Sequence, residues 1–270
     1  MLFKIMKKHY YILLFIVISS CSEYQKALKS EDIAVKFKLG TELYEAEKYN
    51  KANRLFVDIV PKYRGKPQAE KLMYMYAKSF YLIKDYYTAN YQMERFVSAY
   101  PNSEKKEEMA FLAAKSYYHL SPVYTKEQKE TIDGINKMQD FINRFPESEY
   151  LTEANKIVKE LDFKLEKKAF EIARQYNTIT DYQASIKAFD NFLLEYPGTP
   201  LKEQAQYYRF DSAYKLAVNS VEWKKKERLE KALSFFSTFK KYFKDSQYLE
   251  DMIEKENELQ ELLKEYQTQS

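Results

Sequence analysis

The chain has 270 residues and a formal net charge of +4, with only four glycines, seven prolines, two histidines and one cysteine, against 26 tyrosines and 18 phenylalanines. This charge gives no electrostatic case for binding nucleic acid, and so few histidines and cysteines leave out the usual zinc ligands and the usual bases of serine or cysteine nucleophiles. Few turn-forming residues and many aromatic ones predict an all-α protein of long helices, and we expect no enzyme activity.

The first twenty residues have the layout of a secretory signal peptide. Three lysines precede an apolar run from Tyr10 to Ile18, which is shorter than the roughly 20 residues that a membrane-spanning helix needs. The run leads into Ile18-Ser19-Ser20-Cys21, which resembles a bacterial lipobox and places the only cysteine at the cleavage site. We therefore predict a lipid anchor on Cys21, which holds the protein at a membrane through transfer of acyl chains into the bilayer. The alternative is an ordinary signal peptide with an incidental cysteine.

No aspartate follows Cys21, and its absence favours the outer membrane as the destination. Cleavage before Cys21 removes three lysines and no acidic residue, so the formal charge falls from +4 to +1. The mature chain keeps a single histidine, His119.

One phrase returns five times along the chain, at residues 52–66, 89–103, 134–148, 185–199 and 232–246. A small residue is followed four and seven positions later by a large apolar residue, and eleven positions later by an aromatic one. These offsets keep one face of an α-helix, and a proline after it ends the helix in three copies, at Pro101, Pro146 and Pro197. Each copy therefore predicts one amphipathic helix.

A second small residue stands twelve positions before the first in three copies, at Gly40, Ala77 and Ala173. Each lies in its own amphipathic segment, so the unit is a helical hairpin, and the pattern resembles the tetratricopeptide repeat. This resemblance implies an α-solenoid of about five hairpins wound into a right-handed superhelix. The expected organisation is a signal peptide at 1–20, a lipidated leader at 21–32, repeats one to three at 33–148, a bridging helix with repeats four and five at 149–246, and a capping helix at 247–270.

Repeats three and five are longer than the others, because their two small residues stand 20 and 19 positions apart. The surplus lies at 120–133 and at 218–230. It forms either a loop, which in solenoids often belongs to a binding face, or a lengthened second helix.

The first helices of the hairpins line the concave side of a tetratricopeptide array. In register with Gly40, they place aromatic rings and cations on that side, which suits an extended peptide ending in an aromatic residue and a carboxylate. The alternative is that many of these rings pack between hairpins. The predicted groove residues are Phe37, Tyr44, Tyr74, Lys78, Tyr81, Phe111, Lys115, Tyr118 and Arg174.

The lipobox, the leader "SEYQKALKSED", the five repeats, the insertion "YTKEQKET" and the bridge "EANKIVKELDFKLEKKAFEIARQY" together resemble the BamD family, the tetratricopeptide lipoproteins of the outer-membrane β-barrel assembly machinery. The opening "CSEYQKALKS" resembles the version found in Bacteroidetes-type bacteria. The resemblance implies a non-catalytic scaffold that faces the periplasm and docks on a BamA-like barrel subunit. It further implies that the N-terminal repeats help to recruit unfolded outer-membrane proteins, with accessory lipoproteins as further candidate partners and no cofactor.

Three other functions stay open from the sequence. Another periplasmic tetratricopeptide lipoprotein, acting in cell-envelope, peptidoglycan or division complexes, would often carry a coiled coil ahead of the repeats, where this chain has only residues 22–32. A surface glycan binder would use tryptophan side chains to stack on sugars, and Trp223 is the only tryptophan of the chain. A helical peptidoglycan lyase would need a catalytic carboxylate, and no acidic residue stands out from its solvated face.

Overall fold

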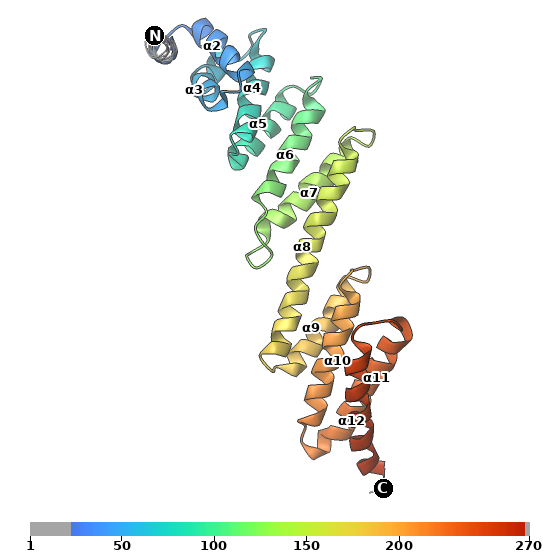
Figure 1. Ribbon diagram of the computed structural model, residues 1–270. Coiled ribbons are helices and arrows are strands. Elements are labelled where there is room, and N and C mark those ends of the chain that lie inside the picture. The colour runs from blue at the N-terminus through green and yellow to red at the C-terminus, as the bar shows by residue number, and fades with distance from the viewer. Residues whose placement is uncertain (1–22, 268–270) are drawn as a thin grey trace, which may run out of the picture. The chain divides into compact units, whose positions relative to one another are not determined.

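The computed structural model describes residues 23–267, so Cys21 and the signal peptide predicted before it lie outside the described residues. All regular structure within them is helical, which confirms the predicted all-α class (Figure 1). None of the described helices is both long and apolar enough to cross a membrane. After a helical segment at 23–29, the elements are α2 (Ile33–Glu45), α3 (Tyr49–Ile59), η1 (Val60–Tyr63), α4 (Ala69–Leu82), α5 (Tyr86–Ala99), α6 (Lys106–Leu120), α7 (Lys129–Arg144), α8 (Leu151–Thr178), α9 (Tyr182–Glu195), α10 (Lys202–Val218), α11 (Glu222–Tyr242) and α12 (Leu249–Gln267).

The described chain divides into two compact units, and the division falls within α8. Unit 1 ends at Leu161 and unit 2 begins at Asp162, except that the segment Val123–Gln128 also belongs to unit 2. The predicted bridge is thus a single helix whose first part packs in unit 1 and whose second part packs in unit 2.

The residues of the repeated sequence form the interior of each hairpin. Its small residues and its large apolar residues are buried in all five copies, as the helical periodicity predicts. Gly40, the small residue on the first helix of hairpin one, shows why this position is small. A Cβ atom there would lie 2.5 Å from the ring of Phe56, which is itself fully buried. Close approach of the two helices of a hairpin therefore selects the small residues, and the aromatic rings fill the space beside them.

The same tight turn joins the two helices in three hairpins. Glu47, Lys84 and Thr180 adopt the left-handed backbone conformation, with φ of 58°, 65° and 67°. The aspartates that follow Lys84 and Thr180 cap α5 and α9, because each carboxylate accepts a hydrogen bond from a backbone N–H of the first helical turn.

The two surplus segments behave differently from each other. In repeat three, α6 ends at Leu120 and α7 begins at Lys129, so most of the surplus is a loop. In repeat five, α10 ends at Val218 and α11 begins at Glu222, so the surplus extends the second helix to 21 residues. Both alternatives offered by the sequence are therefore realised, one in each repeat.

The last helix covers the end of the solenoid. Met252 and Leu259 of α12 are fully buried against α10 and α11, and they join the core of unit 2. An apolar stripe that would otherwise face water at the open end of the array is thereby removed from solvent.

Candidate functional site

The predicted groove residues of unit 1 lie on the first helices of successive hairpins. Phe37 and Tyr44 come from α2, Tyr74, Lys78 and Tyr81 from α4, and Phe111, Lys115 and Tyr118 from α6. Two of these helix pairs, α2 with α4 and α4 with α6, are in direct contact. Side chains one repeat apart can therefore meet.

Lys78 is already paired with an acidic residue of the next repeat. Its ammonium group lies 2.5 Å from Glu108 Oε1 and donates a hydrogen bond of 2.8 Å to the Tyr74 hydroxyl, which itself donates to Glu108. Burial disfavours the charge and acts to lower the pKa of Lys78, but the hydrogen bonds to Glu108 and Tyr74 outweigh it and hold the pKa above its usual value. Lys78 therefore carries a positive charge, which the carboxylate of Glu108 balances.

The next junction repeats this arrangement. Lys115 on α6 lies 2.6 Å from Glu153, and Tyr118 donates a hydrogen bond of 2.7 Å to Glu160, both acids belonging to the unit 1 part of α8. The bond to Glu160, with burial second, raises the pKa of the Tyr118 hydroxyl. We call the set Tyr74, Lys78, Glu108, Lys115, Tyr118, Glu153 and Glu160 the charge-paired row.

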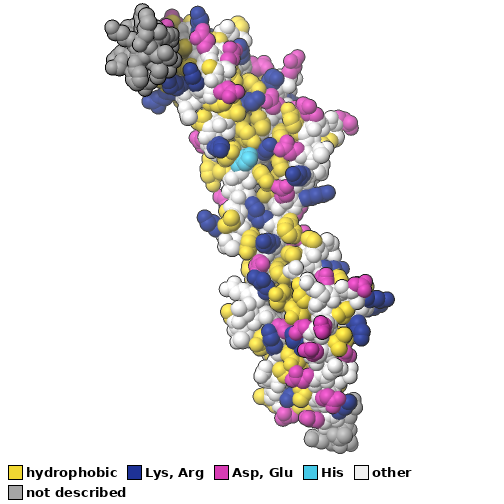
Figure 2. Space-filling model, viewed as in Figure 1, with side chains coloured by type: hydrophobic (Ala, Val, Ile, Leu, Met, Phe, Trp, Pro, Cys, Tyr) yellow, Lys and Arg dark blue, Asp and Glu magenta, His cyan; other side chains and the backbone are white. Residues whose placement is uncertain are grey.

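An aromatic cluster adjoins the charge-paired row at His119. This imidazole stacks on Tyr86 at a centroid distance of 4.4 Å, and its Nε2 lies 3.0 Å from the Tyr81 hydroxyl. Burial, and then the neighbouring Lys115, lower the pKa of His119, so the ring is neutral at neutral pH. Figure 2 shows this histidine at the surface in cyan, next to hydrophobic and charged side chains.

Three predicted groove rings pack against the protein itself. Phe111 is only 2% exposed and stacks on Tyr150 at 4.6 Å, so its assignment to a peptide-binding surface is wrong. Phe37 stacks on Tyr63, and Tyr44 packs between Tyr49 and Phe56. Phe37 and Tyr44 on α2 thus pack within the first hairpin, against η1 and α3, rather than between hairpins as the alternative proposed.

Arg174 belongs to unit 2. It is exposed on α8, lies 2.7 Å from Glu171, and borders a hollow of about 480 Å³ together with Ile172, Lys168 and Tyr124. Unit 2 also has its own contacts of the same kind between α10 and α12, where Tyr207 donates to Asp251 and Tyr214 donates to Glu258.

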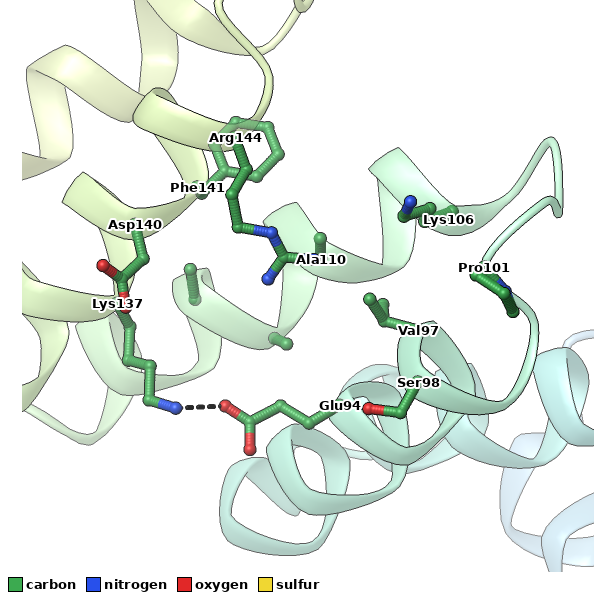
Figure 3. A pocket seen from close by; sticks show the side chains of 12 residues that line it. Glu94, Val97, Ser98, Pro101, Lys106, Ala110, Lys137, Asp140, Phe141 and Arg144 are labelled. Atoms are coloured by element: carbon green, nitrogen blue, oxygen red, sulfur yellow. Dashed lines mark hydrogen bonds and ion pairs between the residues drawn. The ribbon is translucent and has the colours of Figure 1, made fainter.

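A cleft that the sequence did not indicate lies between α5, α6 and α7 in unit 1 (Figure 3). It encloses about 460 Å³ above a floor of small and apolar side chains, and charged side chains stand on its rim. Across one side, Lys137 of α7 lies 2.5 Å from Glu94 of α5. We call this hollow the α6 cleft. Its lining residues are Glu94, Val97, Ser98, Pro101, Lys106, Ala110, Ala113, Ala114, Lys137, Asp140, Phe141 and Arg144.

Within residues 23–267, no group of three or more histidine, cysteine, aspartate or glutamate side chains is placed to hold a metal ion.

A family model described as "YfiO: Outer membrane lipoprotein" matches residues 30–189 and 167–269. No curated protein matches the sequence. Solved structures that resemble the chain include two of a Podosopora anserina putative kinesin light chain with nearly identical TPR-like repeats. They share 12% and 11% identity, each covers 77% of this chain and 96% or 98% of its own length, and both have a TM-score of 0.32.

Proposed function

The chain belongs to the YfiO family of outer membrane lipoproteins, and from this we propose that it is a non-catalytic scaffold subunit of the outer-membrane β-barrel assembly machinery. The observation that carries the proposal is the family match, which extends over nearly all of the described chain. A solenoid of tetratricopeptide type offers extended protein-binding surfaces, as a scaffold requires.

In this proposal the protein docks on a BamA-like barrel subunit and helps to recruit unfolded outer-membrane proteins. It faces the periplasm, tethered by lipid on Cys21, and it resembles the Bacteroidetes-type version of the family. Energy for insertion comes from folding of the barrel, so the scaffold needs only to bind.

The proposed contact surface for clients consists of the charge-paired row and the adjoining aromatic cluster of His119, Tyr81 and Tyr86. Exposed edges of Tyr74, Tyr81 and Tyr118 can receive an aromatic side chain of an extended peptide. The cations beside them are paired with acids, so a client carboxylate has to compete with Glu108 or Glu153 for them. Recognition of this kind is weak and reversible, which suits a protein that passes its clients on.

Co-purification tests the scaffold proposal. The tagged full chain, isolated from detergent-solubilised envelopes, is expected to bring down a BamA-like barrel subunit in stoichiometric amount. A preparation that instead carries peptidoglycan-synthesis or division proteins, with no barrel subunit, would replace the proposal by its main alternative.

A further inference from the structure

The α6 cleft has the composition of a site for an apolar side chain. Ala110, Ala113 and Ala114 of α6 form its floor, and Phe141 and Val97 close it from α7 and α5. Because the floor side chains are so small, a hollow of about 460 Å³ opens between the flanking helices. This volume falls within the range of about 300–1,000 Å³ typical of ligand pockets.

The rim of the α6 cleft has cations without acidic partners. Lys137 is neutralised by Glu94, but neither Lys106 nor Arg144 has an acidic side chain within ion-pair distance among the described residues. Figure 3 shows Arg144 reaching from the end of α7 over the cleft toward Ala110. The lining has three cations, Lys106, Lys137 and Arg144, against two acids, Glu94 and Asp140, so a carboxylate brought to the cleft would meet a rim with a net positive charge.

Exposed aromatic rings continue this surface along α5. Tyr87 and Tyr91 stand one helical turn apart and are 63% and 58% exposed. The guanidinium of Arg95 lies 5.6 Å from the Tyr91 ring, and the shallow hollow beside this pair shares Glu94 and Ser98 with the α6 cleft. Exposed tyrosine and arginine side chains beside an apolar pocket are typical of protein-binding hot spots.

The α6 cleft and the charge-paired row lie on opposite sides of α6. With 100° per residue, Lys106, Ala110 and Ala113 share one side of the helix. Glu108, Lys115 and Tyr118 fall on the other side. A ligand in the cleft therefore leaves the row accessible, so that unit 1 can hold two partners at once.

We propose that the α6 cleft is a docking site for a peptide segment of a partner protein in which a carboxylate side chain stands next to a large apolar side chain. The apolar side chain enters the hollow above Ala110 and Ala113, and the carboxylate pairs with Arg144 and Lys106. The aromatic rings of α5 cover the adjoining part of the segment. The inference rests on the cleft alone and does not depend on the function proposed above.

Selection from a random peptide library tests this site directly. The full chain, purified in detergent, is used as bait, and the peptides are fused to their carrier at the C-terminus so that no terminal carboxylate contributes. We expect enriched peptides to carry Asp or Glu beside Leu, Ile, Met or Phe. Arg144→Glu, an exposed change at the rim, is expected to weaken binding of a selected peptide about tenfold and to shift a repeated selection toward Lys and Arg.

Two further variants complete the test. Lys187→Glu, which reverses an exposed charge on α9 in unit 2, is expected to leave the selection unchanged. Ala110→Phe fills the hollow and is expected to remove the apolar preference, with an unchanged circular-dichroism spectrum as the check on folding. The proposal is overturned if no peptide is enriched, if acidic peptides are enriched without an apolar neighbour, as for a simple anion site, or if Arg144→Glu selects the same peptides.

Discussion

The ammonium group of Lys78 lies 2.5 Å from a carboxylate oxygen of Glu108, which stands 30 residues later in the chain and one hairpin further along the solenoid. Both side chains are mostly withdrawn from water. The pair therefore joins two repeats and also occupies a cation that a ligand would otherwise use. Lys115 and Glu153 do the same at the next junction.

Neutralising Glu108 should strengthen the binding of a peptide carboxylate. Glu108→Gln keeps the size of the side chain but frees the charge of Lys78, so we expect the Kd of a client-type peptide ending in a free aromatic residue to fall about threefold to tenfold. Fluorescence anisotropy with a labelled peptide measures the change.

The amidated form of the same peptide is the matched control for Glu108→Gln. It has the aromatic side chain but no terminal carboxylate, so its affinity should not change. An equal gain for both forms, or no gain for either, would remove Lys78 from client recognition and leave the scaffold proposal in place.

Acidification should destabilise unit 1 through His119. Burial and Lys115 lower its pKa below the ordinary value of 6.5, so the unfolded chain takes up the proton first. Stability from the neutral ring is complete above about pH 6.5 and is lost as the pH falls through the lower folded-state pKa. We expect the Tm of the wild type to fall more steeply than that of His119→Gln between about pH 7 and pH 5. Parallel Tm profiles for the two proteins would contradict this account.

Loss of Asp211 should be the costliest single change among the ion pairs of unit 2. This carboxylate is 4% exposed, lies 2.9 Å from Lys255 and 2.6 Å from Lys215, and accepts a hydrogen bond from Asn177. Asp211→Ala leaves the buried Asn177 amide without this acceptor, removes the carboxylate paired with Lys215, and leaves Lys255 with Asp251 alone. We therefore expect a loss of about 1–3 kcal/mol in the free energy of unfolding. Urea unfolding measures it. The exposed Lys156→Ala variant should lose about 0–1 kcal/mol, and equal losses would contradict the network's importance.

The same network predicts that unit 2 loses stability at acid pH. Burial acts to raise the pKa of Asp211, but hydrogen bonds from Lys215, Lys255 and Asn177 outweigh it and hold the pKa below 3.8. The stability it contributes is therefore complete above that value and is lost as the pH falls further, through the folded-state pKa. Asp211→Asn should lack this part of the acid destabilisation.

Gly40→Ala should destabilise the first hairpin. The added Cβ would lie 2.5 Å from the fully buried ring of Phe56, and this overpacking outweighs the better helix propensity of alanine, for a net loss of about 1–2 kcal/mol. Thermal unfolding measures the change. Gly198→Ala, where the Cβ meets nothing within 4 Å, is the control and should stay within about 0.5 kcal/mol. A larger loss at Gly198 than at Gly40 would show that contact with Phe56 is not what requires glycine at position 40.

The sequence predicts the repeat core well, because burial of Ala52, Phe56 and Ile59 follows from their helical spacing. It does not predict which surface cation is paired, since Lys78 meets Glu108 only through the stacking of hairpins. A tyrosine or lysine on one first helix and a glutamate 30 to 42 positions later was the available signal, as in Tyr118 and Glu160. The α6 cleft gave no such signal, because it depends on the distance between α5 and α7 above the alanines of α6.

A role in barrel assembly can be measured by depleting the protein in its native cells and following the fraction of folded β-barrel proteins in the outer membrane. Folded barrels keep a characteristic electrophoretic mobility until they are heated, so the folded fraction can be read for several barrels at once. We expect this fraction to fall during depletion, while lipoproteins of the same membrane keep their level, and we expect the wild-type chain to restore it. An unchanged folded fraction in fully depleted cells would contradict a role in barrel assembly.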